Sequence, residues 1–302
     1  MIRVSSVIPV FNGERTIRAA IDSVLAQEFD GQEAIVVDDG STDATPAILA
    51  GYGDRIRVLT QPNRGVAAAR NAGVRASRGE YLAFLDSDDQ WLPGRLARTF
   101  AALAAAPSAV MAFADVLASD GQGKLSVVRT GPAPSMKDLL TALTRMQCGT
   151  WLVRRTAFER CGGFAEEFKG CGGEDSWMLL LLREQGEFVY VDEPLLRYST
   201  AAWSVIGAKY DYARAPLLRM LRERYGRRSK ALRIDVSRCY ASSYFQRSLE
   251  QLERGDRRGA ARSLLSSVRS RPTYLFESGA AIRMLNSSNL QRLYRFILPA
   301  RQ

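Results

Sequence analysis

The sequence of 302 residues contains no histidine. Mechanisms that need a histidine base, a histidine beside a nucleophile or a histidine metal ligand are therefore excluded. Any acid–base chemistry must come from carboxylates, Lys, Tyr or Cys. Cysteine is also scarce: the four cysteines lack the paired C-x-x-C spacing of a zinc site, and we expect free thiols in a reducing compartment.

Long apolar runs are absent as well. The longest uninterrupted run covers residues 100–106, far below the roughly 20 apolar residues that span a bilayer. The first residues turn polar too early for the apolar core of a secretory signal. These two features predict a protein that is made and kept in the cytoplasm.

Negative charge is scarce in the last third of the chain. Residues 205–302 carry 21 Lys and Arg against 7 Asp and Glu, whereas residues 1–204 carry 21 against 25. The overall charge of +10 therefore comes from the C-terminal part, and the two parts are expected to do different work. We predict one domain over 1–204 and a basic extension over 205–302.

The first part alternates strand-like apolar runs, at 4–10, 34–37, 56–60 and 81–85, with amphipathic helical patterns. This alternation predicts an α/β fold with a mostly parallel sheet flanked by helices. After residue 203 strand signals nearly vanish, and Arg-rich helical patterns predict an all-helical C-terminal extension.

Polar clusters follow three of these strands: Phe11 with Asn12, Asp38 with Asp39, and the acidic run 86–89. Ligands of open parallel sheets bind beyond the carboxyl ends of the strands. Carboxylates packed at a strand end repel one another unless a cation neutralises them, and oxygen ligands suit Mg²⁺ or Mn²⁺. The alternative for each acidic run is a solvated turn before a helix, and for Phe11 a buried aromatic.

Four segments in this order and spacing, VIPVFNGE, VVDDGSTD, NRGVAAARNAG and GEYLAFLDSDD, resemble the nucleotide-binding half of a family 2 glycosyltransferase of the GT-A fold. The resemblance covers roughly residues 2–200. It implies transfer of a sugar with inversion from a nucleotide-sugar donor, with UDP as the default nucleotide, and a Mn²⁺ or Mg²⁺ ion bridging the donor diphosphate.

The resemblance also implies roles for individual residues. The nucleotide pocket is expected to be lined by Pro9, Val10, Phe11 and Asn12. Asp39 would hold the base, Asp86 would lie near the ribose, and Asp88 would bind the metal. Arg70 and Asn71 match a frequent pair that we assign to the nucleotide-sugar site, although Arg70 fits a plain charge on a helix face equally well.

The catalytic base is expected on the acceptor side. The run Gly172-Gly173-Glu174-Asp175 matches the family's E-D motif, which implies Asp175 as the base and Glu174 as the fallback. Such a carboxylate accepts the proton of the attacking hydroxyl. The alternative is a pair of acids favoured by the dipole at a helix start. Many relatives carry a histidine farther along, where this chain has Arg197, which we assign to phosphate contact.

These features predict an inverting glycosyltransferase acting in cell-surface or extracellular glycan synthesis, with a glycan or lipid-linked acceptor. A catalytically silent protein that binds nucleotide-sugars is the alternative. The basic extension 205–302 suits peripheral contact with the anionic inner face of a membrane, a protein partner, or simply a solvated surface. No nucleic-acid partner is expected, because no recognition motif accompanies the charge.

Overall fold

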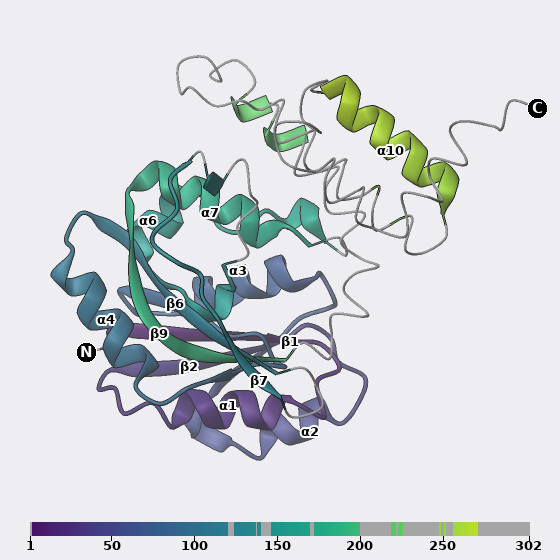
Figure 1. Cartoon of the computed structure of the whole chain (residues 1–302). Coiled ribbons are helices and arrows are strands. Elements are labelled where there is room, and N and C mark those ends of the chain that lie inside the picture. The colour runs from purple at the N-terminus through teal and green to yellow at the C-terminus, as the bar shows by residue number, and fades with distance from the viewer. Residues whose placement is uncertain are drawn as a thin grey trace, which may run out of the picture. The chain divides into compact units, whose positions relative to one another are not determined.

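The computed structural model describes residues 2–119, 124–136, 138–139, 146–169, 172–199, 219–221, 223–225, 248, 251 and 256–270 (Figure 1). The chain divides into two compact units. The larger comprises Met1–Leu139 and Thr144–Ala213, and the smaller comprises Leu140–Leu143 and Arg214–Gln302. In the smaller unit the longest described element is helix α10, Arg257–Ser270. Most of the predicted helical extension lies outside the described residues.

The larger unit is built on a nine-stranded sheet with the path β3-β2-β1-β4-β8-β6-β9-β5, and β7 pairs with β6. Its first four strands are β1 Val4–Val10, β2 Gln32–Asp38, β3 Arg57–Thr60 and β4 Tyr81–Phe84. They are parallel, as the alternating sequence pattern predicts. They are connected through helices α1 Ile17–Leu25, α2 Thr45–Ala50 and α3 Val66–Ala76 and the short turn η1 Gly53–Arg55.

The two faces of this parallel part are covered by different helices, with α1 and α2 on one face and α3 on the other (Figure 1). All seven residues of β1 are buried, because side chains of successive residues point to opposite faces and both faces are packed. Gly73 of α3 lies so close to the sheet that a Cβ atom there would be 2.4 Å from Val7 Cγ1. A close helix-to-strand approach therefore depends on this glycine.

The second half of the sheet mixes directions. β4 with β8, β8 with β6, β6 with β7 and β5 with β9 are antiparallel, whereas β6 and β9 are parallel. The strands are β5 Gln90–Trp91, β6 Ala109–Ser119, β7 Leu125–Val128, β8 Leu152–Arg154 and β9 Glu187–Ser199. The helical elements are α4 Arg95–Ala105, η2 Cys148–Thr150, α6 Arg155–Arg160, η3 Glu166–Phe168 and α7 Glu174–Gln185.

The fold class is thus the predicted α/β architecture. All strand pairs are parallel in the first half of the sheet, whereas the second half mixes parallel and antiparallel pairs. Within the described residues, no helix is both long enough and apolar enough to cross a membrane.

Candidate active site

The first two strands end in loops that are hydrogen-bonded to each other. Asn12, which follows β1, has a positive φ of 52°, a backbone conformation that asparagine tolerates better than most residues. Its N–H donates to Ser41 Oγ over 2.9 Å, and its Oδ1 accepts from the Thr42 N–H over 2.8 Å. Phe11 is 49% exposed, so the buried-aromatic alternative is wrong, whereas Pro9 and Val10 are buried within β1.

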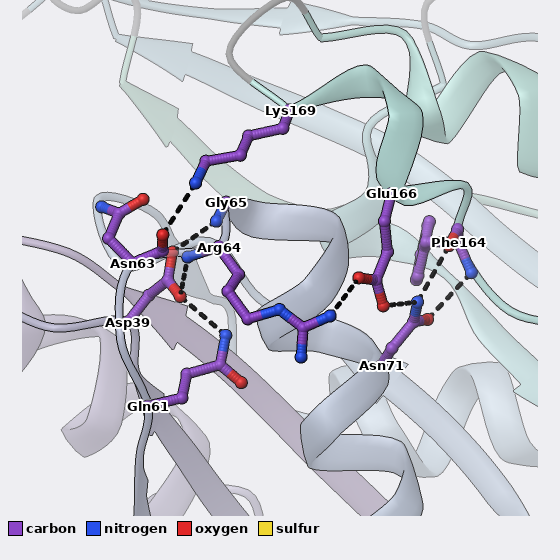
Figure 2. Close-up of polar contacts among 9 residues, drawn as sticks. All are labelled: Asp39, Gln61, Asn63, Arg64, Gly65, Asn71, Phe164, Glu166 and Lys169. Atoms are coloured by element: carbon purple, nitrogen blue, oxygen red, sulfur yellow. Dashed lines mark hydrogen bonds and ion pairs between the residues drawn. The ribbon is translucent and has the colours of Figure 1, made fainter.

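Asp39, which follows β2, is 4% exposed and accepts three hydrogen bonds. Its Oδ1 accepts from the side chain of Gln61 over 2.7 Å and from the N–H of Arg64 over 2.9 Å, and its Oδ2 accepts from the N–H of Gly65 over 2.7 Å. Figure 2 shows this carboxylate on the inner side of the turn 61–65. Asp39 therefore fixes the shape of that turn, and about one of the four lone-pair positions of a carboxylate remains open.

The acidic run after β4 places three carboxylates close together. Asp89 is 3% exposed and accepts a 3.2 Å hydrogen bond from the N–H of Ser199. Reduced hydration and then the charge of Asp86 raise the pKa of Asp88 to about 6, and the same causes raise that of Asp89 well above its usual value. Crowded carboxylates of this kind are relieved by protons or by a cation.

The same residues decide whether a divalent ion fits. The described part of the chain holds no group of three or more Cys, Asp or Glu side chains arranged to bind a metal. Mg²⁺ and Mn²⁺ sites in nucleotide-dependent enzymes use one or two carboxylates and complete their shell with water and substrate phosphates. The raised pKa of Asp88 and the neighbouring Asp86 fit such a site.

Arg70 of α3 connects this acidic run to the start of α7. Its side chain is only 4% exposed; Nη2 lies 2.5 Å from Asp86 Oδ1 and Nη1 lies 2.9 Å from Glu174 Oε1. The alternative of a plain charge on a helix face is therefore wrong. The buried pair also brings the E-D motif to the edge of the sheet where β4 ends.

The two acids of the E-D motif have different surroundings. Glu174 is 6% exposed and is held by Arg70. Asp175 is partly exposed, accepts a 2.6 Å hydrogen bond from the Ser176 N–H, and forms no ion pair with any described residue. Loss of hydration and then the charge of Glu174 raise the pKa of Asp175 to about 6. The preceding Gly173 has a φ of 103°, a conformation that favours glycine.

Comparison with known proteins identifies the family of the chain. A family described as "Glycosyl transferase family 2" matches residues 5–162, just over half of the chain. The chain belongs to this family.

Curated relatives align over the same region. The succinoglycan biosynthesis protein ExoO of Rhizobium meliloti is 45% identical over 122 residues, which cover 39% of this chain and 35% of that protein. The putative glycosyltransferase EpsH of Bacillus subtilis is 45% identical over 92 residues, covering 30% and 26%. The chain thus matches about a third or less of these relatives' lengths.

Solved structures extend the likeness to most of the chain. S. aureus TarS 1-349 in complex with UDP-GlcNAc superposes with a TM-score of 0.57 at 16% identity, covering 90% of this chain and 91% of that chain. The mannosyltransferase PcManGT of Pyrobaculum calidifontis, in complex with GDP-Man and Mn²⁺, gives 0.56 at 18% identity and covers 97% and 83%. The family 2 chain therefore has the GT-A fold.

Only some of the predicted site residues lie at the same edge of the sheet. Asp39, Asp86, Asp88 and the E-D motif follow strands or begin a helix at the edge where the parallel strands end. Arg197 is exposed in β9, opposite Gln90 and two residues before the Ser199 that binds Asp89, so its phosphate role stays a prediction.

Asn71 contacts a segment far along the chain, and its predicted nucleotide contact stays a prediction. It is 8% exposed and bonds to Phe164 and Glu166. Sequence reasoning missed both of these partners, as well as Gln61 and Lys169 around the turn 61–65. The only local signal was the Gly162-Gly163 pair before Phe164.

Proposed function

We propose that this family 2 protein is an inverting glycosyltransferase that moves a sugar from a nucleoside diphosphate donor to an acceptor hydroxyl. The observation that carries the proposal is the ion-pair bridge Asp86–Arg70–Glu174, in which Arg70 and Glu174 are buried, and which joins the acidic run after β4 to the acids at the start of α7. Family membership supports sugar transfer as the reaction, and the polysaccharide role of ExoO supports a cell-surface or extracellular glycan as the product.

On the donor side, Asp39 would accept the N–H of the base with its remaining lone pair. Phe11, which is exposed directly after β1, would cover the base. Asp88 would hold a Mn²⁺ or Mg²⁺ ion, and Asp86 would lie near the ribose. When bound, that ion neutralises charge on the departing diphosphate. A UDP-sugar is the default donor, supported by the UDP-GlcNAc in TarS. The GDP-Man in PcManGT makes a GDP-sugar the second candidate donor.

On the acceptor side, Asp175 would take the proton of the attacking hydroxyl. A base works best with a pKa near the working pH, and the value of about 6 places Asp175 closer to neutrality than an ordinary aspartate. Glu174 would act on Asp175 only through its charge, because Arg70 already holds it. Attack from the face opposite the leaving diphosphate gives inversion.

The acceptor and the cellular place complete the proposal. We propose a glycan or lipid-linked acceptor and a cytoplasmic protein whose extension 205–302 contacts anionic membrane through its basic residues. Co-sedimentation with anionic vesicles at low salt would support the membrane contact, and no co-sedimentation under that condition would exclude it.

The deciding experiment is calorimetric titration of UDP, GDP and TDP with and without Mn²⁺, on the wild type and on Asp88→Ala. Metal-dependent binding of one nucleotide, lost in the variant, is the expected result. No binding of any nucleotide would remove the basis of the proposal. Turnover with any acceptor then separates an enzyme from a silent nucleotide-sugar-binding protein.

A further inference from the structure

We propose that Asn71 is a positioning residue: it fixes the segment 164–169, and with it the start of α7 that carries the acceptor-side acids, against the donor-side helix α3. This inference rests on the proposed function. It replaces nucleotide contact as the role of Asn71, and it joins two parts of the site that lie about 100 residues apart in the sequence.

The polar atoms of Asn71 are committed to this segment. Its Nδ2 donates to Phe164 O over 2.8 Å and to Glu166 Oε1 over 3.2 Å, and its Oδ1 accepts from the Phe164 N–H over 2.9 Å (Figure 2). Both amide N–H groups are therefore used, and the side chain is 8% exposed. A carboxamide has two donors and one acceptor oxygen, so no donor is left for a nucleotide.

The backbone just before the segment allows the segment to approach Asn71 closely. Gly163 has a φ of +84°, and a Cβ atom there would lie 2.8 Å from Asn71 Oδ1. The positive φ favours glycine, and a side chain at that position would push the segment away from the carboxamide.

Arg70, the residue before Asn71 in α3, also contacts Phe164. The Arg70 guanidinium carbon lies 5.2 Å from the centre of the Phe164 ring, and this ring, 2% exposed, packs edge-on against Phe84 at the end of β4 with centroids 5.2 Å apart. Since Arg70 also pairs with Glu174 and Asp86, two adjacent residues of α3 determine where the acceptor-side segment lies.

The far end of the segment meets the outer side of the donor turn. Lys169 Nζ donates to Asn63 O over 2.7 Å, and Arg64 pairs with Glu166 at 2.8 Å (Figure 2). The turn 61–65 is thus held from inside by Asp39 and from outside by the segment. These outer contacts are exposed and individually weak, so the buried Asn71 carries the positioning.

The test is Asn71→Asp, which preserves the shape of the side chain but replaces the donating Nδ2 with an oxygen facing Phe164 O and the Glu166 carboxylate. We expect faster backbone hydrogen exchange over 164–169 and at the start of α7, with exchange over β1 unchanged. Nucleotide affinity should stay at the wild-type value. With an acceptor, kcat should fall by about 100-fold, the cost of misplacing a catalytic group by roughly 1 Å, and KM for the donor should not change.

Arg75→Gln serves as the control, because Arg75 is exposed near the end of the same helix; it should leave exchange, affinity and kcat unchanged. If Asn71→Asp proves too unstable to purify, Glu166→Gln probes the same contact from the segment and should accelerate exchange over 164–169 to a smaller extent.

Weaker nucleotide binding without faster exchange over 164–169 would overturn the proposal and return Asn71 to the nucleotide site. Unchanged exchange with unchanged kcat would also overturn it. Failure of the proposed function shows itself differently, as a wild type that binds no nucleotide and turns over no acceptor; the exchange measurement still tests what Asn71 holds.

Discussion

Asp175 and Glu174 are adjacent acids that the fold treats differently. Arg70 holds the buried Glu174 over 2.9 Å, whereas Asp175 keeps a partly exposed carboxylate with a pKa raised to about 6. A base must be ionised to accept a proton. Substitutions of the two residues are therefore expected to have clearly different effects on activity.

Replacing Asp175 with Asn should lower kcat by roughly 100- to 10,000-fold, the usual contribution of a positioned general base. Nucleotide affinity, measured by calorimetry, should not change, because the proposed role of Asp175 is toward the acceptor hydroxyl. In the wild type, kcat/KM should rise with pH through about 6 as Asp175 loses its proton. An Asp175→Asn variant with near-normal kcat would assign the base to another residue.

Replacing Glu174 with Gln tests the electrostatic role of this acid. The charge of Glu174 is the second cause of the raised pKa of Asp175, after loss of hydration. Its removal should lower that pKa and move the acid limb of the pH–rate profile to lower pH. A limb that stays in place, or moves to higher pH, would contradict the predicted coupling; a complete loss of activity at every pH would make Glu174 itself the base.

Helix α3 is the element that links the acidic run after β4 to the start of α7. One face packs on the sheet through small side chains, and the first turns direct Arg70 and Asn71 toward α7 and segment 164–169. Its position is set by the contact of Gly73 with Val7. A displacement of the helix from the sheet would therefore move both polar residues at once.

Gly73→Ala measures how tightly this helix is packed. Helix propensity alone would stabilise alanine over glycine by up to about 1 kcal/mol. The added Cβ, however, would lie 2.4 Å from Val7 Cγ1 and 3.2 Å from Val37 Cγ2. The overpacking should outweigh the gain in helix propensity and lower the free energy of unfolding by about 1–3 kcal/mol, as measured by urea denaturation. A gain in stability would show that the helix yields easily.

At the scale of the whole molecule, Asp88 in the acidic run after β4 makes the stability of the fold depend on pH. The pKa of Asp88 is raised to about 6 in the folded chain, above the ordinary value of about 4. Folding therefore favours the protonated form. Stability from this group is present at low pH and is lost as pH rises from about 4 through about 6.

Asp88→Asn should remove this dependence. The free energy of unfolding of the variant should exceed that of the wild type by more at about pH 8 than at about pH 4, because position 88 carries no charge in the variant at either pH. Adding Mn²⁺ at about pH 8 should raise the melting temperature of the wild type but not of the variant. Equal responses of the two proteins to pH and to Mn²⁺ would favour the solvated acidic turn over a metal site.

Much of the parallel half of the fold was predictable from the sequence, because each strand and helix there is a local pattern of apolar residues. The predicted strands at 4–10 and 34–37 correspond to β1 and β2, and the acidic run after the fourth strand follows β4. The carboxyl ends of parallel strands meet at one edge whatever the loops contain. The motifs therefore predicted the family and the sheet edge at which the polar clusters lie.

The partners of individual side chains were decided by the tertiary structure alone. Nothing in the spacing of Arg70 and Asn71 indicates that one will bridge Asp86 and Glu174 while the other binds the backbone of Phe164. Contacts between residues about 100 positions apart depend on how the antiparallel half folds back onto α3, and such long-range packing leaves no periodic signal. The sequence by itself determined the family, the parallel strands and the acids. The tertiary structure decided that Arg70 pairs with Glu174 and not with Asp175, and that Asn71 binds the segment after Gly163, because these contacts form only when distant parts of the chain pack together.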